Sequence, residues 1–136
     1  MTPSLLVTDT HPLIYFFCGE QRRLSNNALL AFEGALTGAV TIFVPVPVLW
    51  EISMLVSKDH ISLNQPFSDW VDSLFKIQMF VEAPFSGEVI KTLHQIRYHS
   101  DPFDRSIVAT ALHLDLPLIT KDSKMHDAKP CEIYWD

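Results

Sequence analysis

Several features that indicate common classes of protein are missing from this sequence. Its 136 residues contain no run of eighteen apolar residues, so we expect no membrane-spanning helix. The first residues lack a basic segment followed by a long apolar run and a small-residue cleavage site, which indicates a mature cytoplasmic protein. Only two cysteines are present, Cys18 and Cys131, and their spacing matches no metal-site pattern, so we expect two reduced thiols.

Motifs for two widespread chemistries are also missing. The sequence has four glycines, and none of them belongs to a phosphate-cradling loop. There is no Gly-x-Ser-x-Gly elbow of the kind that carries a nucleophilic serine. The six histidines are dispersed. His11 and His99 lie near acidic residues and could contact a substrate, but a helix-end or surface position explains each of them more simply. These absences argue against nucleotide-binding and serine-hydrolase functions.

What is present indicates a packed α/β protein. Apolar residues make up 48% of the chain and charged residues 19%, which is typical of a globular domain. The length suits one sheet with helices on both faces and is too short for two cores, so we expect residues 1–136 to form a single domain. Short apolar runs alternate with amphipathic stretches, the pattern of a parallel sheet with crossover helices.

The predicted elements follow from this alternation together with capping and turn residues. Ser25 is expected to cap a helix, and Pro12 and Pro102 suit a first helical turn. We predict strands at residues 5–8, 41–44, 79–81, 117–120 and 132–134, a short helix opening at residue 11, and helices at 25–37, 47–57, 66–77, 87–98 and 102–114.

Two of the buried-type strands end in an aspartate, Asp9 after the first and Asp122 after a later one. In open parallel sheets, functional sites form beyond the carboxyl ends of the strands, so these carboxylates should meet at one edge. Taken singly, each aspartate could equally start a turn or cap a helix.

Three further acids are expected near this edge. Asp101 precedes Pro102 and is best explained as a helix cap. Asp104, in the first turn of the same helix, projects onto its apolar face, where a charge is costly unless it is paired or bound to a metal. Glu51 flanks the apolar stripe of the helix that directly follows the second strand, a position that is usually solvated when considered alone.

The charges of this group favour bound cations. No block of lysine or arginine accompanies the acids, and carboxylates held close together raise one another's pKa and repel. Mg²⁺ or Mn²⁺ would remove that conflict, because both prefer oxygen ligands. The net charge of −6 is concentrated in this group, so overall acidity does not exclude RNA as a substrate.

Four stretches resemble the PIN-domain family, and specifically its VapC-like toxins. Residues 5–11 are similar to the family's opening strand and first acid, and residues 49–52 to its Trp-Glu helix. Residues 99–111 resemble the Asp-Pro-Phe-Asp-Arg box of one toxin subgroup, and residues 116–122 the Leu-x-Thr-x-Asp ending. Each stretch alone is a weak signal, but four in this order and at these separations are specific.

The resemblance implies a PIN-like three-layer α/β/α fold with a central parallel sheet of strand order 3-2-1-4-5. It also implies a Mg²⁺- or Mn²⁺-dependent endoribonuclease that cuts RNA, inhibition by a cognate antitoxin, and assembly as a homodimer and a toxin–antitoxin hetero-oligomer. The family often has a serine after the second strand, where this chain has Pro45. The implied catalytic and metal-binding residues are Asp9, Glu51, Asp104 and Asp122, with Asp101, Thr10, Arg105 and Thr120 as accessory residues.

Other interpretations remain open at this point. A PIN fold could bind RNA or a partner without cutting it. A phosphoacceptor signalling domain also has strand-end aspartates and a late lysine, here Lys121, but it needs an acid pair after the first strand, and Asp9 stands alone. A haloacid-dehalogenase-type phosphatase needs Asp-x-Asp there, and His11 occupies the second place.

Exposed apolar surface is expected to receive an amphipathic segment of the antitoxin. The candidates are the region around Leu13, Phe16 and Phe17 and the helix that carries Trp50 and Met54, although both could be ordinary core or a self-association face.

Overall fold

The computed structural model describes residues 2–98 and 100–136 and contains a five-stranded parallel sheet. The strands are β1 (Leu5–Thr8), β2 (Thr41–Pro45), β3 (Phe80–Ala83), β4 (Leu118–Ile119) and β5 (Ile133–Tyr134). Their spatial order is β3-β2-β1-β4-β5, and every neighbouring pair is parallel, which confirms the predicted order 3-2-1-4-5.

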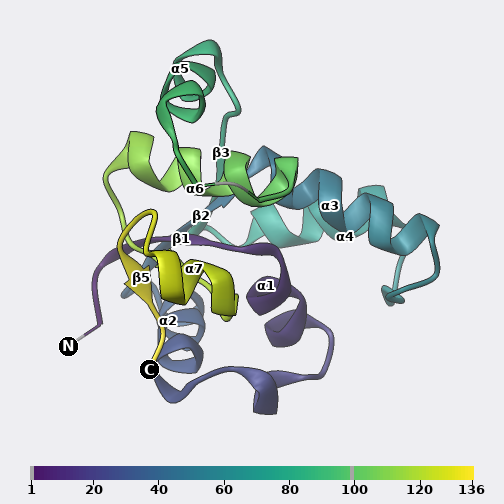
Figure 1. Cartoon of the computed structure of the whole chain (residues 1–136). Coiled ribbons are helices and arrows are strands. Elements are labelled where there is room, and N and C mark those ends of the chain that lie inside the picture. The colour runs from purple at the N-terminus through teal and green to yellow at the C-terminus, as the bar shows by residue number, and fades with distance from the viewer. Residues whose placement is uncertain (1, 99) are drawn as a thin grey trace.

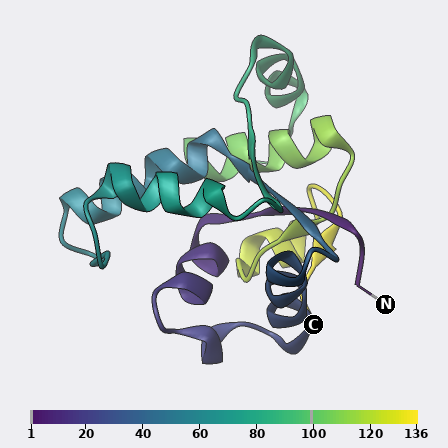
Figure 2. The ribbon, with the colours of Figure 1, turned by 180° about the vertical axis from the view of Figure 1, so that it is seen from behind.

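Helices cover both faces of this sheet. Figures 1 and 2 show α1, α2 and α7 on one side, α3, α4 and α6 on the other, and α5 packed on the outer side of α6. The helices are α1 (Thr10–Phe17), α2 (Asn26–Thr37), α3 (Val46–Ser57), α4 (Phe67–Lys76), α5 (Gly87–Gln95), α6 (Pro102–Leu114) and α7 (Ser123–Ala128), with a short 3-10 helix η1 (Gln21–Arg23).

Local signals in the sequence set most of these boundaries. The hydroxyl of Ser25 accepts a hydrogen bond from the backbone N–H of Ala28 and caps α2 as predicted. Gly38 ends that helix with a φ of 89°, a left-handed conformation that glycine adopts without strain. The predicted helix at residues 102–114 agrees with α6, whereas α5 ends at Gln95, three residues earlier than predicted.

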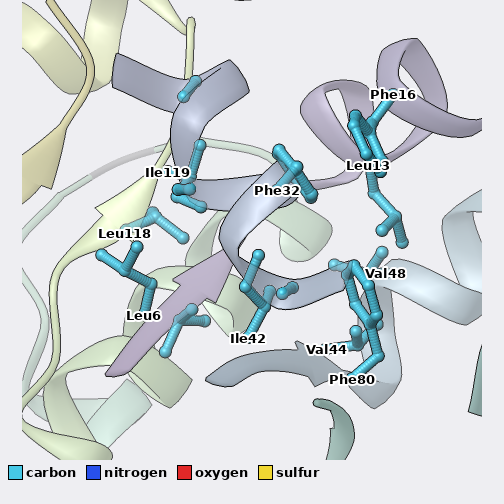
Figure 3. Packing of buried hydrophobic residues seen from close by; sticks show 14 of the residues in the cluster. Leu6, Leu13, Phe16, Phe32, Ile42, Val44, Val48, Phe80, Leu118 and Ile119 are labelled. Carbon is cyan, nitrogen blue, oxygen red and sulfur yellow. The ribbon is translucent and has the colours of Figure 1, made fainter. Parts of the chain in front are cut away.

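The core lies between the sheet and its helices (Figure 3). Leu6 and Ile42 from adjacent strands are fully buried, as is Leu13 on α1. Phe16 is also buried, and its ring stacks on Phe32 of α2 at 5.0 Å between centroids. The expectation that Leu13 and Phe16 offer an exposed docking surface is therefore wrong, because both are buried where α1 packs against η1, α2 and α3. Phe17, the third residue of that region, is partly buried.

Within the described residues, no helix combines the length and the apolar character needed to cross a membrane.

Candidate active site

The parallel pairing of β1 with β4 brings two strand-end aspartates to one edge of the sheet. Thr8 is in register with Ile119, and the backbone N–H of Asp9 donates to the carbonyl of Ile119 at 2.9 Å. Asp9 therefore leaves β1 at the level where β4 ends, close to where the chain continues to Asp122. The predicted meeting of these two acids at the carboxyl edge is confirmed.

Glu51 and Asp104 reach the same place from two other elements. Glu51 lies on α3, directly after β2, and Asp104 lies in the first turn of α6. Both are partly exposed, in contrast to Asp9, which is only 7% exposed. One open cleft of about 520 Å³ is lined by Asp9, Glu51, Asp101, Asp104 and Asp122.

A hydroxyl group donates to each of three of these carboxylates. Thr120, buried at the end of β4, donates to Oδ2 of Asp9 at 2.7 Å. Thr10 donates to Oε1 of Glu51, and Ser100 donates to Oδ2 of Asp104 at 2.8 Å. Neutral donors thus orient the acids without cancelling their charge, which leaves the carboxylates free to bind a cation.

Thr10 and Thr120 act at more than one point of the cleft. The backbone N–H of Thr10 donates to Oδ1 of Asp9 at 2.8 Å, so this residue contacts both Asp9 and Glu51. The hydroxyl of Thr120 accepts from the N–H of Asp122 at 3.1 Å while it donates to Asp9. Both predicted accessory threonines therefore connect two of the acids.

Helix capping accounts for part of the geometry of three acids. Asp101 is exposed, and its Oδ1 accepts from the N–H of Asp104 at 2.9 Å, which is the capping contact that the Asp-Pro pair predicts. Asp9 caps α1, and Oδ1 of Asp122 accepts from the N–H groups of Lys124 and Met125. Capping fixes these side chains at the cleft, so the capping and the metal-binding interpretations are compatible.

Burial and mutual repulsion raise the pKa of the central acids. Burial, opposed by the hydrogen bonds from Thr120 and Thr10 and reinforced by the charge of Glu51, raises the pKa of Asp9 to about 6. Burial and the charges of Asp101, Asp9 and Asp122 likewise raise the pKa of Asp104 to about 6. Burial is also the main cause of a raised pKa at Glu51.

The donor set of the cleft suits a hard divalent cation. All the acids offer carboxylate oxygens, and within residues 2–98 and 100–136 the only ion pairs, Arg23–Glu20 and Lys91–Glu88, involve none of the cleft acids. Over the same residues, no three carboxylate, histidine or cysteine side chains are placed to enclose one metal ion. The carboxylate donors thus fit a divalent cation, and the side chains would have to draw closer together to enclose it.

Three further residues that the sequence singles out are Arg105, His11 and His99. Arg105 does not line the acid cleft, because its Nη2 donates to the carbonyl oxygens of Leu93 and Ile96 at the end of α5. His11 lines the cleft and is exposed, and a positive charge on its ring opposes the burial that raises the pKa of Asp9 and of Glu51. His99 lies outside the described residues.

The sequence did not identify Tyr15, Arg23, Lys121 and Ser123 as residues of the cleft, nor Ser100 as the donor to Asp104. Lys121 could have been noticed from its position directly before Asp122. Tyr15 carried no such signal because it lies among the apolar residues of α1, and only the packing of η1 beside α1 brings Arg23 to the cleft.

Comparison with known proteins identifies the family. The PIN-domain model matches residues 6–129. Ribonuclease VapC22 of Mycobacterium tuberculosis is 31% identical over 126 residues, which cover 92% of this chain and 91% of that protein.

Two solved structures share the fold at low sequence identity. VapBC2 from Rickettsia felis bound to a promoter DNA fragment aligns with a TM-score of 0.70 and 16% identity, covering 97% of this chain and 99% of that chain. DNA-bound VapBC from Salmonella typhimurium aligns with a TM-score of 0.67 and 15% identity, covering 97% and 98%. By the match over most of its length, the chain belongs to the PIN-domain family.

Proposed function

We propose that this protein is a metal-dependent endoribonuclease and the toxin of a toxin–antitoxin pair, in which Asp9, Glu51, Asp104 and Asp122 hold Mg²⁺ or Mn²⁺. The observation that carries the proposal is the convergence of four carboxylates, from the ends of β1 and β4 and from α3 and α6, in one cleft. The family match and the relationship to Ribonuclease VapC22 support ribonuclease activity.

The metal would supply activation of a water molecule and stabilisation of the leaving oxygen of the RNA phosphodiester. The protein's own residues prepare the cleft for it. Thr120 and Thr10 donate hydrogen bonds to the carboxylates of Asp9 and Glu51 and thereby orient them. The raised pKa of Asp9 and Asp104 means that cation binding near neutral pH completes their ionisation and relieves their repulsion.

Cleavage of a generic single-stranded RNA tests this activity. We expect chelator-treated protein to be inactive, activity to return with Mn²⁺ or Mg²⁺, and Asp9→Asn to remain inactive with either metal. Asp104→Asn should also abolish cleavage, whereas Asp101→Asn should retain it, because Asn caps a helix as well as Asp does. Metal-dependent RNA binding without any cleavage would instead identify a PIN fold that binds RNA and does not cut it.

The proposed role as a toxin also implies protein partners. We propose that residues 1–136 act as a single cytoplasmic domain that forms homodimers and binds a cognate antitoxin. Trp50, which is 65% exposed and packs against Phe103, borders an apolar groove of about 470 Å³ that also includes Met54. The groove suits an amphipathic segment of the antitoxin. An arginine of the antitoxin would compete with the cations for the carboxylates.

Pull-down of the product of the neighbouring small open reading frame, followed by RNA cleavage with the isolated complex, tests the toxin assignment. We expect the complex to cut RNA more slowly than the free protein. Equal rates, or the absence of a partner together with unaffected growth on expression, would contradict the toxin role and leave the nuclease assignment standing.

A further inference from the structure

One wall of the acid cleft is basic and aromatic. Arg23 on η1 and Lys121, just after β4, line the same cleft as the carboxylates. The two cations converge on one ring, because Cζ of Arg23 lies 4.3 Å and Nζ of Lys121 lies 5.7 Å from the ring centroid of Tyr15. Contact with an aromatic face stabilises a cation and restricts its position. We call Tyr15, Arg23 and Lys121 the basic rim.

The cations of the basic rim are not committed to the carboxylates of the cleft. Nη1 of Arg23 donates to Glu20 at 2.9 Å, in a pair whose side chains are 45% and 40% exposed. An exposed pair of this kind contributes little, and the guanidinium keeps further N–H donors. Lys121 forms no ion pair within the described part of the chain.

Tyr15 itself is a fixed support. It is only 6% exposed, so it is held by the surrounding packing and offers little free face for a nucleobase. Its position beside both cations restricts two long side chains that would otherwise move freely in solvent. The surface that the rim presents to the cleft is therefore its pair of positive charges.

A polyanion needs such charges to enter this cleft. The protein carries a net charge of −6, and five acidic residues line the cleft, so an RNA strand is repelled unless cations offset them. Metal ions at the carboxylates would attract the phosphodiester to be cut. Neighbouring phosphates need separate positive partners, and phosphate contacts of this kind position a strand without reading its sequence.

We propose that Arg23 and Lys121, held by Tyr15, bind the backbone phosphate next to the phosphodiester that lies at the carboxylates, and thereby set the path of single-stranded RNA through the cleft. This inference rests on the proposed ribonuclease function. Arg23 and Lys121 are binding residues in it, and Tyr15 is a positioning residue.

The test compares Arg23→Ala/Lys121→Ala with a control, Arg22→Ala/Lys76→Ala, that removes the same charge from positions that do not line the cleft. Binding of a fluorescent, non-cleavable single-stranded RNA is measured with Mn²⁺ over a range of salt concentrations, and cleavage of the same sequence in cleavable form is also measured with Mn²⁺. The rim variant should raise KM by about tenfold or more, the loss expected for a charge-assisted hydrogen bond, with a smaller effect on kcat.

The salt dependence separates specific phosphate binding from general charge. In the rim variant the slope should become shallower by about 0.7 for each phosphate that is no longer neutralised, while the control keeps the wild-type slope. Arg23→Lys should give a salt slope closer to that of the wild-type protein than to that of the rim variant, because it keeps the charge. Tyr15→Leu, checked for folding by circular dichroism, should raise KM while retaining both cations.

The possible outcomes distinguish the proposed role of the basic rim from the proposed ribonuclease activity. If wild-type protein cuts RNA and the rim and control variants give equal KM values and salt slopes, the basic rim is contradicted and the nuclease stands. If wild-type protein binds RNA through the rim but cuts none, the rim stands and the nuclease is contradicted. If wild-type protein neither binds nor cuts RNA, both are contradicted.

Discussion

Asp9 has the most demanding environment of the cleft acids. It is buried, it accepts hydrogen bonds from the hydroxyl of Thr120 and the N–H of Thr10, and it lies near the charge of Glu51. Burial dominates, and the pKa of Asp9 rises to about 6. A buried carboxylate with a raised pKa near other acids makes the metal-free protein sensitive to pH.

We predict that metal-free protein loses stability as the pH rises from about 4 to about 6. In this range the folded state keeps a proton on Asp9 that the unfolded chain, with the ordinary pKa of 3.8, has already released. For a pKa shift of this size the free energy of unfolding falls by up to about 3 kcal/mol, and it falls no further above pH ~6. Urea unfolding in chelator at pH 4.5 and pH 7 measures it. In Asp9→Asn the difference should shrink, and an identical pH dependence in both proteins would contradict the prediction.

Thr120 offers a matched test of how the acids are oriented. Thr120→Val removes the hydroxyl that donates to Asp9 and accepts from Asp122, and we expect RNA cleavage to fall by about tenfold or more, a loss typical of one hydrogen bond to a charged group. The pKa of Asp9 should rise further, which shifts the acid limb of the pH profile to higher pH. Thr110→Val is the control, since that buried hydroxyl donates to a carbonyl within α6. Equal pH profiles in the two variants would contradict the role of Thr120.

At the scale of elements, α5 and α6 are joined through Arg105. This side chain lies on α6, and its Nη2 donates to the carbonyls of Leu93 at 3.1 Å and Ile96 at 3.3 Å, at the end of α5. The carbonyl of Leu93 also accepts the N–H of Ile96, so Arg105 adds a second donor to the last turn of that helix. The segment between these helices carries Asp101, which lines the cleft, and Ser100, which donates to Asp104. Arg105 thus serves the site by holding the end of α5, without touching the acids.

We expect Arg105→Ala to lower the free energy of unfolding by about 1.5–3 kcal/mol, the usual range for hydrogen bonds to a charged group. Arg105→Lys should recover little of it, because an ammonium group does not reproduce the planar fork of the guanidinium. Urea denaturation measures the change, and Arg97→Ala, which removes an exposed arginine close in sequence, is the control. Losses of equal size in the two alanine variants would contradict this role.

The elements show what a sequence can and cannot predict here. The strands that begin at residues 5 and 41 were predictable because each is a short apolar run that ends at a residue unfavourable in a strand, an aspartate or a proline. Helix α7 was not predicted, because its six residues are too few for a periodic pattern, although the Asp122 cap marks its start. The face that α1 exposes was predicted wrongly, since a helix that is apolar on most sides does not reveal which side meets the sheet.

The candidate site was predictable for a similar reason. Each of its four acids is tied to a strand end or to a helix near one, so topology alone brings them together. The basic rim was not predictable, because Arg23 and Lys121 are distant in sequence and meet only through Tyr15 in the folded protein.

For the whole molecule, the proposed activity depends on metal binding to a cleft whose carboxylates repel one another. Divalent cations should bind only the folded state, so the melting temperature is expected to rise with their concentration. The cations also neutralise the acidic centre of a protein of net charge −6, which leaves the basic rim to attract RNA.

The most direct test is the anomalous scattering of manganese in crystals of the free protein soaked in millimolar Mn²⁺. We predict manganese density between the carboxylates of Asp9 and Asp104, with Glu51 or Asp122 as further ligands, and the loss of this density in Asp104→Asn crystals. Manganese bound only outside the acid cleft, or equal density in wild-type and Asp104→Asn crystals, would contradict the central claim that these carboxylates form the metal site.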